Sequence, residues 1–370
     1  MGVRYHKHKV KERIKESVEY FVNDVERYDA DNQYPNNISK IVNQSLNLTA
    51  CTDLYCQFLY GEGFKDLGEI QANDSENIND IFLKVCKDYS KHNAACLFIG
   101  KNALNEVSVI RHIPYQYARR KKSSKDWIVY NNWDYSKNTT RFYRQEDFVH
   151  LQDYNESNDI SSDYVGQLYL ISHNNKSYPL SKIDPLIELA IADHLLAVKK
   201  LKRIENNFSL KQVVLVPEQP ERTPIYGENN NIIGYEGQSV HDIMNDFVGE
   251  DGSELMIIEG SDMENPPFKS IPISSGSSEN FQYEEESIRN QMISFFNQPL
   301  ALRSVPKTGV VFSNDQIKES YVYYNNVTNA DRLFLQRKMN NIFESIGIGT
   351  GEILVKQFND FGSVVENVID

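Results

Sequence analysis

Hydrophobic side chains recur at steps of three and four residues in several stretches of the chain, which is the period of an amphipathic helix. Residues 4 to 28 show this period together with a basic first half, and Ile78 to Tyr89 shows it again. Between the two, Tyr34-Pro35 predicts a break in the chain. A second helix then leads toward a turn at Gly61-Glu62-Gly63. Three helices are therefore expected before residue 90.

The pattern changes after this point to short runs of β-branched and aromatic residues separated by polar turns, which is typical of strands. The predicted strands are Ala95 to Ile99, Glu106 to Ile113, Trp127 to Asn131, Arg141 to Tyr143, Phe148 to Leu151 and Gln167 to Ile171. Helices followed by strands predict an α+β fold for the first half of the chain.

A Pro-led helix opens the second half. Asp184 as a cap and Pro185 in the first turn predict a helix that runs to about Asn206. Its apolar residues cover most of the circumference, so it needs neighbours on several sides. Strands at Gln212 to Val216, Glu254 to Glu259 and Phe268 to Ile273, with a helix at Val240 to Val248, then predict a small αβ insert.

Two further helices are predicted after the insert. Ser277 to Asn297 has helical periodicity and ends before Pro299. The following loop, residues 299 to 312, ends at Ser313, which forms a capping box with Gln316. A long helix then runs to about Gly347.

Charge is distributed unevenly along the 370 residues, whose formal net charge is −13. Residues 218 to 289 contain sixteen acidic and three basic residues, an excess equal to the net charge of the whole chain, so the remainder is balanced. Basic residues of that remainder cluster at the N-terminus, at Arg119 to Lys125 and at Lys199 to Arg203. The net charge argues against a simple nucleic-acid binder that wraps phosphate with Lys and Arg.

The motifs of common enzymes are absent from the sequence. It contains no H-E-x-x-H, no G-x-S-x-G and no Gly-rich phosphate loop followed by Lys-Ser/Thr. Glu284 to Glu286 occupy adjacent helical positions and cannot converge on one ion within one chain. The four Cys lack zinc-ligand spacing, which predicts buried, reduced thiols. We therefore expect no catalytic residues, no metal and no cofactor.

Membrane and secretion signals are missing as well. The most apolar stretch, Leu186 to Leu201, is interrupted by charged residues, and no apolar core follows the basic N-terminus. We expect a protein that is made and kept in a cytoplasm.

The order of these parts resembles the portal proteins of tailed bacteriophages, in the small form without a large crown. The shared features are Tyr34-Pro35, Ser45 in a helix, an aliphatic run that closes on Gly61-Glu62-Gly63-Phe64, the Pro-led helix, the small αβ insert, a helix ending in Phe296 before Pro299, and the capped helix after Ser313. The family's usual Phe-Gly-Val/Ile-Pro-Pro before the loop is here Phe296-Asn297-Gln298-Pro299.

The resemblance implies a portal-like fold with an α/β wing, a helical stem and a small αβ clip, assembling as a ring. It divides the chain into a wing at 1–182, a first stem helix at 183–207, a clip at 208–276, a second stem helix at 277–298, a channel loop at 299–312, a long helix returning to the wing at 313–346, and a short C-terminal tail at 347–370. The ring would be a dodecamer at one capsid vertex of the virion, assembled in the cytoplasm of a bacterial host.

A ring of this kind would be a head-tail connector that conducts double-stranded DNA in genome packaging and ejection. Its acidic wall would repel phosphate, so that a duplex slides without being gripped. Candidate channel residues are Arg303, Lys307, Glu284 and Glu285. Candidate clip residues that dock a partner are Glu250, Asp251, Glu259 and Asp262. Candidate contacts between subunits in the stem are Leu189, Leu196, Phe281 and Met292.

The partners implied are further copies of the chain, DNA passing without sequence preference, the major capsid protein, the large subunit of the terminase, a head-completion or adaptor protein, and a scaffold. No membrane is implied. The alternative is a capsid-associated or cytoplasmic adaptor whose two long helices form a coiled coil. An adaptor can be a monomer or dimer, whereas a portal must close into a ring.

Overall fold

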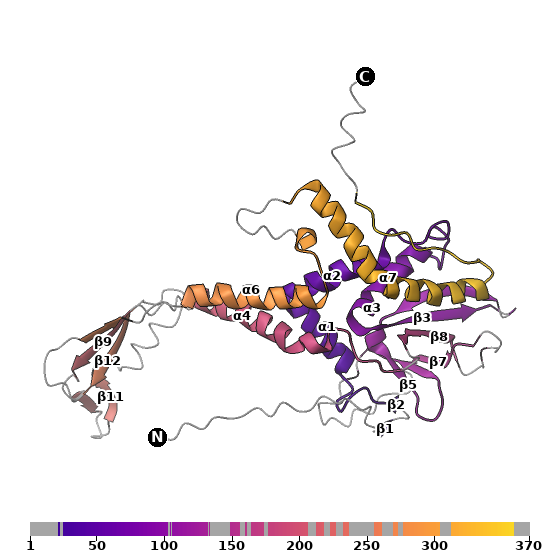
Figure 1. Ribbon diagram of the computed structural model, residues 1–370. Coiled ribbons are helices and arrows are strands. Elements are labelled where there is room, and N and C mark those ends of the chain that lie inside the picture. The colour runs from indigo at the N-terminus through magenta and orange to yellow at the C-terminus, as the bar shows by residue number, and fades with distance from the viewer. Residues whose placement is uncertain are drawn as a thin grey trace. The chain divides into compact units, whose positions relative to one another are not determined.

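The computed structural model describes residues 21–22, 25–102, 104, 106–131, 133, 149–155, 160, 164–173, 177–205, 212–217, 223–226, 232–236, 255–260, 269–272, 277–303 and 312–358. Within these ranges, only the backbone is described for residues 21–22 and 202–281. The chain divides into two compact units. Unit 1 is formed by Met1–Ala190 with Gln291–Asp370, and unit 2 by Ile191–Asn290. Figure 1 shows both.

Unit 1 is a mixed α+β structure, as the sequence predicts. Its first helices are α1 (Tyr34–Gln44), α2 (Leu46–Tyr60) and α3 (Ile78–His92). Ser45 separates α1 from α2: its backbone is extended, and its hydroxyl accepts a hydrogen bond from the Leu48 N–H at 3.2 Å. A side-chain oxygen in this position caps the new helix, so one predicted helix is two.

The sheet of unit 1 has six strands in the order β4-β3-β8-β7-β6-β5. The strands are β3 (Ala94–Lys101), β4 (Val107–Ile113), β5 (Ala118–Arg120), β6 (Trp127–Val129), β7 (Val149–Asp153) and β8 (Gln167–Ser172). All neighbouring pairs are antiparallel except β7 and β8. Each predicted strand within the described residues is present, and β5 is an additional one.

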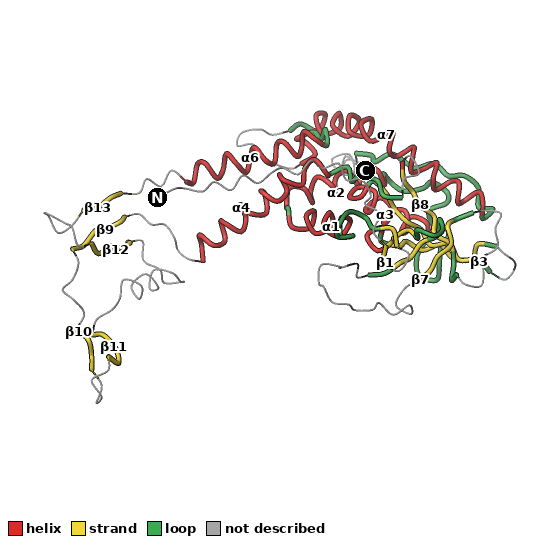
Figure 2. The backbone as a smooth tube through the Cα atoms, turned by 90° about the horizontal axis from the view of Figure 1, so that it is seen from below, coloured by secondary structure: helices red, strands yellow, loops and turns green. Residues whose placement is uncertain are grey.

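The core of unit 1 lies where α3 packs against β3, and Figures 1 and 2 both show the two elements together. Ala94, Ala95, Cys96 and Leu97 open β3 and are completely buried, as are Phe82 and Val85 of α3. All four cysteines are buried and free, as predicted. Burial raises the pKa of the Cys56 thiol to about 12.

The long helix α7 (Asn314–Ser345) completes unit 1 by packing along α2. It begins with the predicted capping box, in which Ser313 and Gln316 bond to each other's backbone N–H groups. After α7 the chain returns to the glycine turn: the Glu62 N–H donates to the Leu354 carbonyl at 3.0 Å. A Cβ on Gly61 would lie 1.9 Å from that carbonyl oxygen, so this turn requires glycine.

A half-buried polar network ties the helices and loops of unit 1 together. Asp331 of α7 accepts hydrogen bonds from the Tyr55 hydroxyl of α2 and, at 3.1 Å, from the Lys182 ammonium. Burial opposes ionisation of Asp331, but these two donors outweigh it, and the pKa of Asp331 is lowered. The carboxylate is therefore ionised and links three segments that are far apart in the sequence.

Two further groups are buried near the β5 end of the sheet. The Arg119 guanidinium is completely buried and donates to the side-chain oxygen of Asn32 at 2.7 Å and to the Asn32 carbonyl at 2.8 Å. His92, at the end of α3, is 3% exposed, and its Nε2 lies 3.2 Å from the Ser39 hydroxyl. Burial lowers the pKa of His92 to about 4, so the imidazole is neutral at pH 7.

Unit 2 contains two long helices and short strands. The helices are α4 (Ile187–Glu205), which starts in unit 1 after a 3-10 turn at Asp184–Leu186, and α6 (Ser277–Phe295), which ends there. The strands β9 (Gln212–Pro217), β12 (Leu255–Gly260) and β13 (Lys269–Pro272) form one sheet in the order β12-β9-β13. A separate antiparallel pair joins β10 (Thr223–Tyr226) to β11 (Ile232–Glu236).

Several sequence predictions need correction. The predicted helix of residues 4 to 28 is wrong where the structure describes it: β1 (Phe21–Val22) pairs with β2 (Val25–Glu26), and Val25 is buried beside Ile128 and Trp133. The tertiary cluster overrides the helical period. Tyr34-Pro35 begins α1 instead of breaking the chain, because proline fits the first turn of a helix. The strand at 141–143 and the helix at 240–248 lie outside the described residues.

Candidate assembly and channel surfaces

An apolar groove lies between α4 and α6 in the described part of unit 2. The two helices run antiparallel alongside each other (Figure 2), and the groove between them has a volume of about 430 Å³. Its lining is Ala192, Leu195, Leu196 and Lys199 from α4 with Tyr283, Glu284, Ser287 and Ile288 from α6. The walls are therefore mostly apolar.

Large hydrophobic side chains at this groove remain open to solvent. Leu195 is 57% exposed and Tyr283 is 75% exposed, and on the same helix as Leu195, Leu201 is 53% exposed. An ion pair between the helices joins Lys200 to Glu285. Because both partners are about half exposed, that pair contributes little to stability. An apolar groove of this kind on a single chain is typical of a surface that another chain covers.

The predicted channel residues are distributed between the two units. Glu284 is exposed on the groove, and Glu285 forms the ion pair with Lys200. Arg303 ends the 3-10 turn Leu300–Arg303 in unit 1 and is half-buried, with its Nε enclosed. Its positive charge acts on Tyr324 of α7. Arg303 is therefore packed against unit 1 in this single chain, and Lys307 lies outside the described residues.

The residues predicted to contact another subunit differ in how far the single chain buries them. Leu196 lines the groove and is half-buried, and Leu189 is half-buried near the start of α4. Met292 is completely buried in the single chain. It belongs to this chain's own core, so we withdraw it as a contact between subunits. Of Phe281 only the backbone is described.

The predicted docking residues of the acidic stretch fall largely outside the description. Glu259 lies in β12, where only the backbone is described. Glu250, Asp251 and Asp262 lie outside the described residues. The sequence reasoning missed Tyr283, the most exposed aromatic residue of the groove. Its signal was an aromatic residue immediately before Glu284 to Glu286.

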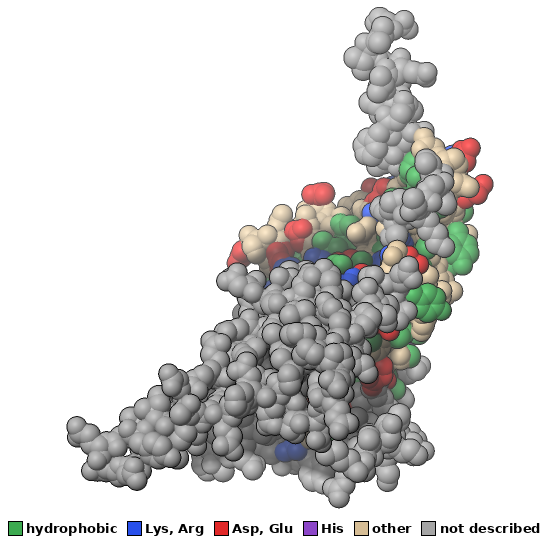
Figure 3. Space-filling model, turned by 90° about the vertical axis from the view of Figure 1, so that its left-hand side faces the viewer, with side chains coloured by type: hydrophobic (Ala, Val, Ile, Leu, Met, Phe, Trp, Pro, Cys, Tyr) green, Lys and Arg blue, Asp and Glu red, His purple; other side chains and the backbone are tan. Residues whose placement is uncertain are grey.

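The remaining described surface mixes residue types. Figure 3 shows hydrophobic side chains exposed beside acidic and basic ones on the described part of one face. On α7 itself, Val322 and Tyr323 are more than half exposed.

Among the described residues, no cluster of three or more His, Cys, Asp or Glu side chains is arranged to hold a metal ion. Within the same residues, every helix is too short or too polar to cross a membrane.

Comparison with known proteins finds similarity in structure alone. No protein-family model matches the chain, and no curated protein matches it in sequence. The fold is similar to that of a chain in the neck of an empty gene transfer agent particle computed with C6 symmetry, with a TM-score of 0.50, 8% identity, and coverage of 89% of this chain and 87% of the other.

Two further solved structures are similar at slightly lower scores. An HK97-family phage portal protein from Corynebacterium diphtheriae has a TM-score of 0.49 and 8% identity, with 90% of this chain and 98% of the other covered. A chain of the neck of the native particle, computed with C12 symmetry, has a TM-score of 0.48 and 9% identity, with 90% and 87% covered.

Proposed function

We propose that this chain is the subunit of a portal, a ring at one capsid vertex of a tailed phage or related particle that conducts double-stranded DNA. The observation that carries the proposal is the fold shared, over about nine-tenths of both chains, with a protein in the neck of a gene transfer agent particle. A neck computed with C6 symmetry has rotational order, and a chain of the same fold is suited to a ring.

The exposed apolar groove supports the same proposal. In a ring, each copy contacts its neighbours through two different surfaces, and such contacts close only if the rotation per copy closes. A neighbouring copy would cover Leu195 and Tyr283, which the single chain leaves exposed. We propose Leu189, Leu196 and Phe281 as further contacts in the stem.

The acidic stretch gives the proposed ring a function other than holding DNA. Glu284 and Glu285 are proposed to face the channel, where like charge repels phosphate and lets a duplex slide. Arg303 and Lys307 are proposed to touch the DNA backbone transiently. Glu250, Asp251, Glu259 and Asp262 are proposed to dock the terminase during packaging and a head-completion protein afterwards.

The copy number and location are also proposals. By resemblance the ring is a dodecamer in the virion, in contact with the major capsid protein and a scaffold during assembly in the host cytoplasm. The competing function is an adaptor that works as a monomer or dimer. The same surface would then cover one partner instead of a neighbour in a ring.

Negative-stain electron microscopy of the purified full chain, classified for top views, tests the proposal. We expect closed rings with a central hole wide enough for duplex DNA. A monodisperse monomer or dimer over a range of salt and protein concentrations would refute the portal and favour the adaptor. For the channel, particles carrying Lys307→Glu should package or retain less DNA, and normal packaging and retention would remove Lys307 from the DNA path.

A further inference from the structure

The hairpin formed by β5 and β6 carries a dense group of basic residues in unit 1, and the proposed ring assigns it no role. Arg119, Arg120, Lys121, Lys122 and Lys125 are followed by a single acid, Asp126. β5 and β6 are antiparallel, with Arg120 opposite Trp127, and the Lys121 N–H donates to the Asp126 carbonyl at 2.8 Å. The turn between the strands is thus closed at its base and presents lysines at its tip.

A polar pocket of about 390 Å³ lies at this turn. It is lined by Glu26, Arg120, Lys121, Lys122, Ser123, Ser124 and Lys125. Four of these side chains are basic, one is acidic and two are hydroxyls, and none is hydrophobic. Lys, Arg and Ser side chains are the groups that contact phosphate oxygens in nucleic-acid complexes.

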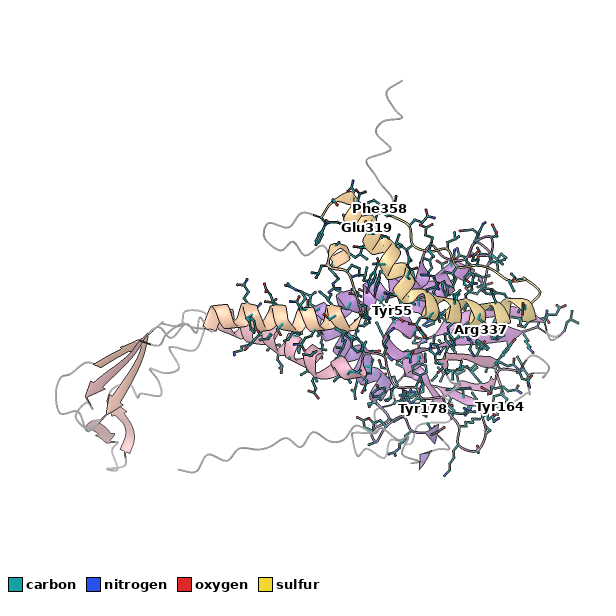
Figure 4. The ribbon with its side chains drawn as sticks, viewed as in Figure 1. Tyr55, Tyr164, Tyr178, Glu319, Arg337 and Phe358 are labelled. Atoms are coloured by element: carbon teal, nitrogen blue, oxygen red, sulfur yellow. The ribbon has the colours of Figure 1, made fainter. Side chains whose placement is uncertain are left out.

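Two of the cations lie against aromatic rings, and the positive charge of Lys121 also acts on the nearby Asp126 carboxylate. The Arg120 guanidinium lies 5.8 Å from the centre of the Trp127 ring and donates to the Ser177 hydroxyl. The Lys121 ammonium lies 5.0 Å from the centre of the Tyr164 ring. Aromatic rings position a cation without neutralising it. Figure 4 labels Tyr164 and also Tyr178, whose hydroxyl accepts from the Arg120 N–H at 2.8 Å.

The acid of the hairpin is held by neighbouring donors. The Asp126 carboxylate accepts hydrogen bonds from the Tyr164 hydroxyl at 2.6 Å, the Ser124 hydroxyl at 2.7 Å and the Asp153 N–H at 3.1 Å. Its oxygens therefore fix the shape of the turn. Lys122 and Lys125 stay exposed at the tip.

The geometry points to this basic hairpin as a binding surface for the phosphate backbone of double-stranded DNA, read without regard to sequence. A protein partner fits less well, because protein interfaces have an apolar and aromatic centre and are depleted in Lys, whereas this lining has no hydrophobic residue. The net negative charge of the chain is equal to the acidic excess of residues 218 to 289, and the remainder, which contains the hairpin, is balanced in charge. The inference does not require a ring.

Fluorescence anisotropy with a labelled duplex oligonucleotide and the full-length chain, at several potassium chloride concentrations, tests this surface. For Lys122→Glu/Lys125→Glu we expect binding weakened about tenfold or more at low salt. The slope of log K against log salt should fall by about 2, roughly one for each phosphate that is no longer neutralised. The variant Lys122→Arg/Lys125→Arg keeps both charges and should bind as the unchanged protein does.

A matched control carries the same charge change elsewhere in unit 1. Lys65 and Lys87 are exposed, and Lys65→Glu/Lys87→Glu should leave the affinity and the salt slope unchanged. Equal losses of affinity in both pairs of variants would overturn the hairpin surface, as would unchanged binding in the hairpin variant. Circular dichroism of each variant establishes that it is folded.

Competition with the labelled duplex distinguishes DNA from other negatively charged ligands of the hairpin. Unlabelled duplexes of unrelated sequence should displace the label equally well. Displacement by polyglutamate at equal charge would overturn DNA in favour of an acidic protein, and displacement by inorganic phosphate at fixed ionic strength would overturn it in favour of a single small anion. Electron microscopy of the same samples separates the proposals: hairpin-dependent binding without rings would refute only the portal, and rings without such binding would refute only the hairpin surface.

Discussion

α3 of unit 1 and α4, which runs into unit 2, are both rich in hydrophobic residues, but they use them differently. Ile81, Phe82 and Val85 of α3 are at most 1% exposed. On α4, Leu195 and Leu201 are more than half exposed, although the helix carries apolar residues around most of its circumference. Unit 1 thus completes its core within one chain, whereas the described helices of unit 2 have more hydrophobic surface than one chain covers.

The difference separates two kinds of residue. Substitutions at the buried polar groups of unit 1 should change the free energy of unfolding of the single chain. Substitutions at the groove of unit 2 should change assembly and leave that free energy nearly unaltered. Both tryptophans, Trp127 and Trp133, lie in unit 1, so selectively excited tryptophan fluorescence in a urea titration reports unit 1 alone.

Arg119→Ala should have the largest effect. It removes a completely buried guanidinium and leaves the Asn32 oxygens without these donors. A buried acceptor that loses its donor typically costs about 1–3 kcal/mol, so for the two Asn32 oxygens we expect about 4 kcal/mol in urea unfolding. The control Arg337→Ala, at an exposed position of α7, should change it by less than about 0.5 kcal/mol. If Arg119→Ala lowered the free energy of unfolding by less than about 1 kcal/mol, the expectation that buried polar groups of unit 1 stabilise the single chain would be contradicted.

Protonation of His92 should have the next largest effect. Its pKa is about 4 in the folded chain and about 6.5 when unfolded, so between these values the unfolded chain binds more protons. The stability contributed by the neutral ring is complete above about pH 6.5 and is lost as the pH falls toward 4, by about 3 kcal/mol in total. Urea unfolding of the native chain should therefore weaken more steeply over this window than that of His92→Gln, and parallel curves would refute the assignment.

The Asp331 network should contribute less, since the carboxylate is partly exposed. Asp331→Asn leaves the Lys182 ammonium without its charged partner and weakens the bond from the Tyr55 hydroxyl. We expect a loss of about 2 kcal/mol, within the range for hydrogen bonds to charged groups. Glu344→Gln, an exposed acid on the same helix, is the matched control and should be neutral. Identical unfolding midpoints for the two variants would show that the network carries no stability.

Substitutions in the groove should have the smallest effect on unfolding and the largest on assembly. Leu195→Asp/Tyr283→Asp places charge on two exposed apolar side chains, so we expect a change of less than about 0.5 kcal/mol. The fraction of rings in electron micrographs should fall sharply. Leu104→Asp makes the same kind of change at a position of unit 1 that is 77% exposed, and it should leave rings intact. Rings that survive the groove variant would remove the groove from the subunit interface.

The sequence predicts most helices and strands because their signals are local. The capping box at Ser313 and the first-turn proline at Pro185 need only neighbouring residues, and α7 and the 3-10 turn that leads into α4 begin at these signals. The prediction of Asp184 as a cap was wrong, because Asp184 lies inside that turn, Ile183 precedes it, and no side chain caps it. β5 was missed because Ala118–Arg120 contains no β-branched residue; its place is set by pairing with β6. The prediction for the start of the chain was wrong because Val25 is buried by a cluster formed with Ile128 and Trp133.

The candidate surfaces could be predicted only in part. The residue pattern of α4 places apolar side chains around most of the helix, so the sequence alone predicts that the helix packs against neighbours on several sides. Whether a given side chain is covered depends on the fold: Met292 and Leu196 have the same apolar character, but Met292 is completely buried and Leu196 lines the groove. The pocket at the basic hairpin depends on Glu26 and on the rings of Trp127 and Tyr164, which no local pattern brings together.

The four buried cysteines can report how often unit 1 opens. All four lie in unit 1, in α2, α3 and β3, and the sequence contains no others. The thiolate is the form that reacts with alkylating reagents, and burial strongly disfavours it here. At neutral pH the rate of alkylation therefore measures how often unit 1 opens. A single cysteine introduced into unit 2 can be labelled with a fluorophore, because the buried native thiols do not react with the labelling reagent while unit 1 is folded.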